Sequence, residues 1–148
     1  MDPSEMAELR TMYIFRPADE QTWGLSYEDL AAKLRKRDAD EFIRVDPGTE
    51  GPVRGSSMHF GITLENEELE GMALLSPEGI ALEDSSAQDA ANFVKWLRSN
   101  IVPEGMLMTF NTRWGLEADL PDALVPDVPR PRLVATFFAH IEATGGLD

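Results

Sequence analysis

The chain has 148 residues, with 27 acidic against 13 basic side chains, a formal net charge of −14 and no cysteine. This length suits a single domain (residues 1–148) with a sizeable core, and the missing cysteine excludes disulfides, thiolate metal sites and a cysteine nucleophile. The N-terminus is acidic, no apolar run nears the roughly 20 residues of a membrane span, and the charge repels phosphates, so we expect a cytoplasmic protein that binds neither membrane nor nucleic acid directly.

The N-terminal part of the chain predicts a strand followed by a capped helix. Thr11–Arg16 is rich in β-forming residues and stops at Pro17. Ser26 offers an N-cap, and Asp29 stands three residues on as an acidic version of the capping-box partner. The apolar spacing after this cap carries the predicted helix to about Arg37.

The next region predicts short strands joined by tight turns. Glu41–Asp46 reads as a strand that ends at a Pro–Gly turn, and the glycine-rich residues 48–57 are expected to form a mobile loop. Three apolar runs then follow, separated by an acidic turn and a Pro–Gly turn, which is typical of an antiparallel meander. These runs are Met58–Leu64, Gly71–Leu75 and Ile80–Leu82.

The C-terminal part predicts two helices on either side of a hairpin. Ser86 and Asp89 repeat the cap spacing, and apolar residues at three- and four-residue steps predict a helix over Ala87–Asn100. Met106–Asn111 and the alternating Leu116–Leu120 are expected to pair as a hairpin that turns at residues 112–115. Prolines between residues 121 and 131 predict an extended connector. The last helix, expected to end near residues 145–146, has the apolar stripe Val134, Phe137, Phe138 and Ile141.

The order of these elements predicts an α+β fold. Clustered strands interrupted by few helices favour a mostly antiparallel sheet of about six or seven strands, with three helices packed mainly on one face. The sequence contains no internal repeat and no second-domain boundary. We therefore expect one acidic α+β domain.

The sequence lacks the motifs of catalysis, metal binding and cofactor binding. His59 and His140 are its two histidines, and without paired ligand spacing each is expected to be a packed or surface residue, although whether they approach each other in space stays open. The acidic turn at residues 38–41 lacks EF-hand spacing, the glycines form no phosphate or dinucleotide loop, and Ser56 and Ser57 lack a nucleophile elbow. We expect no catalytic residue, no metal and no cofactor.

Two tryptophans stand beside glycine in predicted loops or turns. Trp23 and Trp114 are each expected either to cover the core as a lid or to anchor a partner. Trp114 is the more interesting of the two for function, because the acidic residues Glu117 and Asp119 follow it on the predicted hairpin.

The distribution of charge is the most informative functional feature. Residues 61–148 hold 15 acids against 5 bases, and no lysine or arginine occurs from Gly55 to Val94. A field of one sign steers oppositely charged partners, so we expect a basic protein partner that meets an acidic face from Glu65 to Asp84. The residues expected to bind this partner are Glu65, Glu67, Glu68, Glu70, Glu83, Asp84, Trp114 and Glu117.

In overall character the chain resembles the immunity proteins that neutralise bacterial polymorphic toxins, because it is small, strongly acidic and without cysteine or catalytic motif. The resemblance implies an inhibitor whose carboxylates occlude the cationic groove of a basic toxin. Two alternatives stay open. The element order is broadly similar to that of dimeric type III secretion chaperones, which hold an extended client. A small hydrolase or isomerase would instead gather His59 or His140 with two carboxylates in a deep pocket.

Overall fold

The computed structural model describes residues 3–46, 56–75 and 77–144. Its strands are β1 (Thr11–Pro17), β2 (Ile43–Asp46), β3 (Ser57–Leu64), β4 (Glu67–Leu75), β5 (Glu78–Ser85), β6 (Met108–Thr112) and β7 (Ala123–Leu124). Its helices are α1 (Pro3–Glu8), α2 (Tyr27–Arg37), α3 (Ala87–Asn100), α4 (Arg113–Glu117) and α5 (Arg130–Ala143). The strands form one antiparallel sheet in the order β2-β3-β4-β5-β1-β6-β7.

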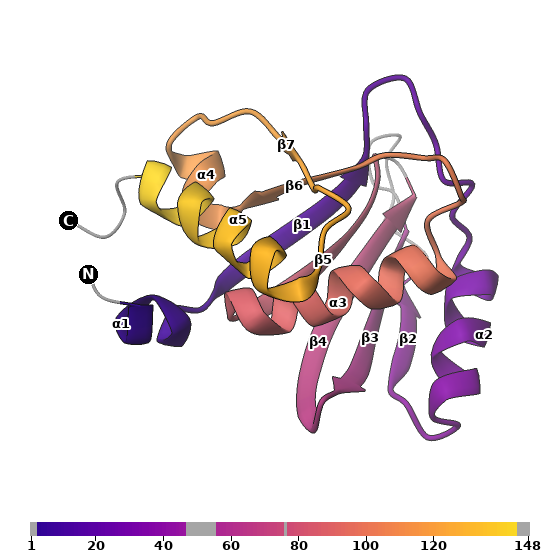
Figure 1. Ribbon diagram of the computed structural model, residues 1–148. Coiled ribbons are helices and arrows are strands. Elements are labelled where there is room, and N and C mark those ends of the chain that lie inside the picture. The colour runs from indigo at the N-terminus through magenta and orange to yellow at the C-terminus, as the bar shows by residue number, and fades with distance from the viewer. Residues whose placement is uncertain (1–2, 47–55, 76, 145–148) are drawn as a thin grey trace.

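The predicted α+β architecture is confirmed. Helices α3 and α5 cross one face of the sheet, and α2 lies at its β2 end (Figure 1). Three of the five helices have seven residues or more, in agreement with the three that the sequence predicts. The predicted loop at residues 48–57 and the predicted helix end at residues 145–146 lie largely or wholly outside the described residues.

The core lies between the sheet and the helices, and aromatic rings dominate it. Side chains of β3 alternate strictly, with Met58, Phe60 and Ile62 buried toward the helices. Phe93 of α3 packs against Phe60 and against Phe15 of β1, with ring centroids 6.3 and 5.9 Å apart. Such close aromatic packing adds to the free energy that burial of these large apolar surfaces supplies.

The helix starts follow the predicted caps. The Oγ of Ser26 accepts a hydrogen bond from the backbone N–H of Asp29 at 3.1 Å, and Ser86 does the same for Asp89 at 3.1 Å. Each cap satisfies one of the N–H groups that a helix leaves without an internal partner. The predicted end of α2 at Arg37 and the predicted bounds of α3 are confirmed.

The turn between β3 and β4 is shorter than predicted. Glu65 and Asn66 have φ angles of 50° and 66°, and Leu64 pairs directly with Glu67. A two-residue loop with both central φ values positive is the turn that suits the twist of a β-hairpin. As a result, Glu67, Glu68 and Glu70 belong to strand β4 and not to a charged loop.

The predicted hairpin of Met106–Asn111 with Leu116–Leu120 is wrong. Residues 113–117 form helix α4, because the Oγ1 of Thr112 accepts the backbone N–H of Gly115 at 3.0 Å and so caps a helical turn. Strand β6 pairs with β1 on one side and with β7 on the other, and β7 lies inside the segment predicted as a proline connector. The short N-terminal helix α1 was also not predicted.

Candidate functional site: the open face of the sheet

Among the described residues, no helix covers one face of the sheet, and we call it the open face. In β1, β3 and β4, the residues that alternate with the buried ones point to this face and are partly exposed or exposed. In β5 the small residues Gly79 and Ala81 on this face are buried, and Glu83 is exposed. The residues discussed below are Met12, Ile14, Arg16, His59, Glu68, Glu70, Met72, Leu74, Gly79, Ala81 and Glu83. Antiparallel sheets commonly leave one face to solvent, but such a face is usually polar throughout.

An apolar groove runs along β5 in the middle of the open face. The open-face residues of β5 there are Gly79, which has no side chain, and Ala81, whose side chain is a single methyl group. The flanking strands carry larger side chains, with Ile14 paired to Ala81 on one side and Met72 paired to it on the other. The resulting hollow has a volume of about 160 Å³, and Met12, Leu74 and Pro77 also line it.

The groove leads into an acidic end formed by three glutamates. Glu83 follows Ala81 at the next open-face position of β5, while Glu70 and Glu68 precede Met72 at the next two such positions of β4. All three side chains are exposed. Among the described residues, neither Glu68 nor Glu70 forms an ion pair with a lysine or arginine. Their negative charge is therefore available to a partner.

His59 lies between two carboxylates on the same face. Its Nε2 is 3.5 Å from Asp46 Oδ2, and its Nδ1 is 3.7 Å from Glu83 Oε1. Arg44, two residues before Asp46 on β2, places a guanidinium nitrogen 3.4 Å from the same Asp46 oxygen. The side chains of His59, Asp46 and Glu83 are 26%, 47% and 43% exposed. This degree of exposure places the group on an open surface and not in a deep pocket.

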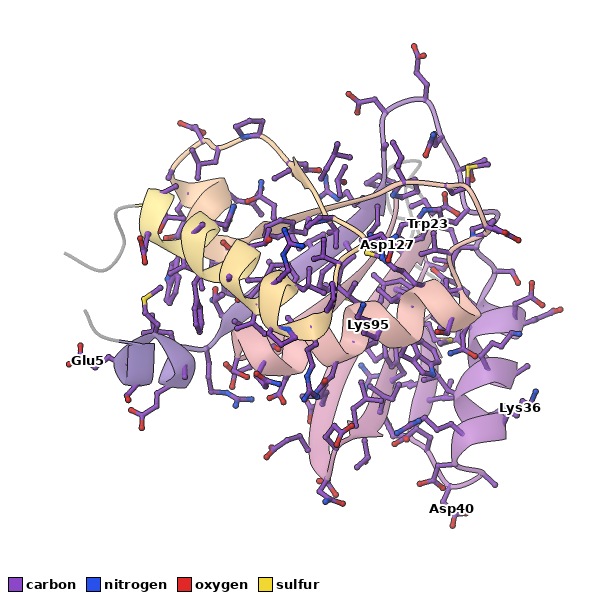
Figure 2. The ribbon with its side chains drawn as sticks, viewed as in Figure 1. Glu5, Trp23, Lys36, Asp40, Lys95 and Asp127 are labelled. Atoms are coloured by element: carbon purple, nitrogen blue, oxygen red, sulfur yellow. The ribbon has the colours of Figure 1, made fainter. Side chains whose placement is uncertain are left out.

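A second hollow, of about 360 Å³, adjoins the acidic end near the β2 edge. Glu68 and Glu70 form one wall, and Asp40, Glu41 and the exposed ring of Phe42 form the other. Burial, together with the nearby Asp38 carboxylate, raises the pKa of Glu41. Asp40 projects outward just beyond the end of α2 (Figure 2). This hollow extends the negative surface beyond the residues that the sequence singled out.

The remaining predicted binding residues do not join the open face. Glu65 lies in the β3–β4 turn, and Glu67 alternates to the opposite side of β4 from Glu68. Asp84 is bound to Arg10 of the same chain, with Nε to Oδ2 at 3.2 Å. Helix α4, which carries Trp114 and Glu117, lies at the other end of the molecule from the β3–β4 turn (Figure 1). A single acidic face that runs from Glu65 to Asp84 and includes Trp114 is therefore not formed.

Both tryptophans in question pack against the core. Trp23 is 5% exposed, and its indole Nε1 donates a hydrogen bond to the carbonyl of Leu107 at 3.2 Å. It lies within the body of the molecule, where its backbone N–H also donates to Glu78 (Figure 2). Trp114 is half-buried and contacts the core from α4. Trp23 therefore serves as a lid on the core.

His140 and His59 lie on opposite sides of the sheet. His140 belongs to α5, where its ring packs against Phe110 at 4.9 Å and its Nε2 is 3.0 Å from the Oγ1 of Thr112. Burial lowers the pKa of His140, so the neutral imidazole is favoured in the folded chain. This histidine contributes to packing around α4, and the two histidines do not share a site.

Comparisons with protein-family models, with curated proteins and with solved structures find no match. Across residues 3–46, 56–75 and 77–144, no helix is both long enough and apolar enough to cross a membrane. Within the same ranges, no three or more histidine and carboxylate side chains are grouped so that they could hold a metal ion.

Proposed function

We propose that this chain is a cytoplasmic binding protein that recognises the basic surface of a protein partner through the open face. The proposal is carried by one observation. The exposed carboxylates Glu68, Glu70 and Glu83 share a sheet face with an apolar groove. A partner that brings lysine or arginine to the acidic end and apolar surface to the groove would satisfy both parts of this face.

The two parts of the face have different physical roles in this proposal. Unpaired carboxylates accelerate the encounter with a cationic partner and favour it over acidic ones, and salt screens this effect. Apolar contacts that lose water on binding mainly slow dissociation, because a few well-buried contacts hold most complexes together. The acids therefore select the partner, and the groove retains it.

The specific partner that we propose is a basic toxin. A protein with this face would inhibit such a toxin by occlusion, because its carboxylates would occupy the cationic groove that otherwise receives nucleic-acid phosphates. Support for this identity comes from the small size and strong negative charge of the chain and from the clustered glutamates of β4 and β5. The protein would then act as the immunity partner of the toxin.

Affinity capture with a matched pair of variants tests this function. The test variant reverses three open-face acids (Glu68→Lys, Glu70→Lys and Glu83→Lys). The control variant reverses three exposed acids elsewhere (Glu8→Lys, Glu104→Lys and Glu142→Lys) and so changes the net charge by the same amount. Wild type, test variant and control are each immobilised, and proteins retained from a lysate of the source cell are identified by mass spectrometry.

We expect wild type and control to retain the same basic protein, which moderate salt releases, and the test variant to lose it. Single exposed substitutions usually change the free energy of unfolding by less than about 0.5 kcal/mol, so all three proteins should remain folded. Circular dichroism checks this. Retention of the same protein by all three would show that the open face is not the binding surface, and retention of only acidic proteins would contradict the proposed partner class.

The groove along β5 also favours a second candidate, a secretion chaperone that holds an extended segment of its client. The two candidates differ in stoichiometry. A chaperone of this kind is a homodimer that binds an unfolded client segment, whereas a toxin inhibitor forms a complex with a folded protein. Light scattering of the isolated chain, whose monomer mass is 16.5 kDa, together with proteolysis of the complex, separates them.

A further inference from the structure

We infer that the groove along β5 receives one aliphatic side chain of the partner, with a lysine or arginine two residues away in the same segment contacting Glu70 and Glu83. This inference rests on the proposed function and deepens it, because it states which pattern of partner residues the open face recognises. The pattern is an apolar residue, any residue, and then a basic residue, in either chain direction.

The shape of the groove sets the size of the apolar residue. Its floor is formed by Gly79 and Ala81, and its walls by Ile14, Met72 and Leu74. These residues are apolar, and Arg16 is the one charged residue among the described residues that line the groove. A cavity of about 150 Å³ with aliphatic and aromatic walls is large enough to hold benzene. The groove here, at about 160 Å³, therefore suits one aliphatic side chain such as leucine or methionine.

The floor of the groove is maintained by the sequence of β5. A Cβ added at Gly79 would approach the Cγ of Arg16 and the carbonyl oxygen of Phe15 to 3.1 Å each, so any larger residue here would crowd β1. Ala81 is 7% exposed between its cross-strand neighbours. Two small residues in alternate positions of a central strand, flanked on both sides by larger ones, leave a shallow trough, and the aliphatic stem of Arg16 lies over its Gly79 end.

The spacing between groove and acids sets the position of the basic residue. Glu83 follows Ala81 by two residues and Glu70 precedes Met72 by two, which is a distance of roughly 7 Å along each strand. An extended ligand has the same repeat, because its side chains on one side also recur every two residues. An aliphatic side chain in the groove therefore brings the side chain two residues away over the carboxylates.

Charge complementarity identifies the occupant as basic. Glu83 and Glu70 lie at one end of the groove, and Glu68 and the hollow near Phe42 continue the negative surface beyond them. At the opposite end Arg16 lies 3.7 Å from Asp122, so its charge is compensated within the chain. The field along the groove is thus negative at one end and balanced at the other, which favours a basic residue at the Glu83 end alone.

Three synthetic pentapeptides with blocked termini test the inference on the wild-type chain. The first, Lys-Ser-Leu-Ser-Lys, has the proposed spacing in both directions. The second, Lys-Ser-Ser-Ser-Lys, has the same charge without the apolar residue. The third, Ser-Lys-Leu-Lys-Ser, has the same composition as the first but places the lysines next to the leucine. Binding is followed by the ¹³C-methyl NMR signals of the methionines, of which Met12 and Met72 line the groove, while Met58 and Met108 are buried on the helical side.

We expect the first peptide to bind about tenfold more tightly than the second, because it buries a leucine side chain. It should shift the signals of Met12 and Met72 and leave those of Met58 and Met108 unchanged. The third peptide should bind more weakly than the first. Equal affinity of the first and second peptides, no binding of either, or unshifted Met12 and Met72 signals would each overturn the inference.

Two variants separate this inference from the proposed function. Ala81→Leu fills the groove and should reduce the affinity for the first peptide to that for the second. If this variant does not fold, the peptide titrations of the wild-type chain still decide the inference. The open-face variant with Glu68, Glu70 and Glu83 changed to lysine should weaken all three peptides. A further outcome is that this charge-reversal variant weakens the binding of all three peptides although the first and second bind equally to the wild-type chain. That result would exclude the groove as a binding site and would still support the acidic face. If the charge-reversal variant leaves their binding unchanged, the proposed function itself fails.

Discussion

Tyr13 buries a hydroxyl group in an apolar part of the core. Its side chain is fully buried, its ring lies 5.2 Å from that of Phe137, and its hydroxyl oxygen has no hydrogen-bond partner among the described residues. Burial strongly raises the pKa of this hydroxyl. A buried polar group without a partner costs free energy, since water satisfies it in the unfolded chain. The hydroxyl group of Tyr13 therefore lowers the stability of the folded chain, whereas its buried ring raises it.

We expect Tyr13→Phe to raise the free energy of unfolding by about 1 kcal/mol, because it removes an unsatisfied hydroxyl and keeps the ring. Tyr27 supplies the matched control, since its hydroxyl oxygen accepts a hydrogen bond from Ser56 Oγ at 3.0 Å. Tyr27→Phe should be neutral or destabilising. Urea denaturation of both variants measures the difference. A loss of stability in Tyr13→Phe as large as that in Tyr27→Phe would show that the buried hydroxyl is satisfied.

The half-buried His140 makes stability depend on pH. Burial lowers its pKa in the folded chain, so the unfolded chain takes up the proton first as the pH falls. The unfolding free energy should therefore decrease as the pH drops through about 6.5, the ordinary pKa of histidine, and continue to decrease until the lower folded-state pKa is reached. Above pH 7 the histidine is neutral in both states and adds no pH dependence.

Substitution of His140 by glutamine should remove this dependence. Glutamine does not titrate and can still reach the hydroxyl of Thr112, which lies 3.0 Å from the histidine Nε2. We expect the stability of wild type to fall more steeply than that of His140→Gln between pH 7 and 5.5, as measured by urea denaturation at several pH values. Parallel curves for the two proteins would contradict a lowered pKa at this position.

At the scale of secondary structure, the formation of helix α4 depends on one hydroxyl group, that of Thr112. Thr112 is fully buried, accepts the N–H of Gly115 at the start of α4 and contacts His140 of α5. The glycine is required here, because a Cβ at position 115 would collide with the side chains of Asn111 and His140. A five-residue helix has little stability of its own, so its cap and its packing decide whether it forms.

We expect Thr112→Val to lower the free energy of unfolding by about 1 to 2 kcal/mol, because valine keeps the shape of threonine and loses the capping oxygen. Thr112→Ser keeps that oxygen and should cost less. Thermal unfolding of the two variants provides the comparison. Equal destabilisation would indicate that the methyl group, and not the hydroxyl, holds α4 in place.

The sequence predicted those elements whose signals are local. Caps at Ser26 and Ser86, the apolar run that forms β3 and the apolar spacing in α3 all act within a few residues, and each is confirmed. The failed hairpin shows the limit of such signals. Leu116, Ala118 and Leu120 alternate like a strand, but the cap at Thr112 and the contact with α5 favour a helical turn there. A tertiary contact overrode the local pattern.

At the scale of the whole molecule, the acids serve different purposes that composition cannot separate. The carboxylate of Glu78 accepts hydrogen bonds from Thr22, Trp23 and Leu25, and Asp84 is bound to Arg10. Glu68, Glu70 and Glu83 instead face solvent together. Which group an acid joins depends on strand register, because a shift of one residue moves a side chain to the other face.

The same dependence on register explains what could be predicted of the candidate site. Glu68, Glu70 and Glu83 were anticipated because charge density is visible in the sequence. The groove was not predicted. A signal for it was present, because β1 and β4 carry apolar residues at successive positions and so on both faces of the sheet. The approach of His59 to Asp46 and Glu83 joins three strands and has no local signal.

The central claim is that local charge on the open face, and not net charge, brings the partner to this protein. The most direct test is the association rate constant for the captured partner, measured by stopped flow at low and physiological salt. The three proteins compared are wild type, the open-face charge-reversal variant and the control variant of equal net charge. We expect the open-face variant to associate roughly tenfold or more slowly at low salt, with a smaller difference at physiological salt, while the control stays near wild type. Equal slowing of both variants, or of neither, would contradict it.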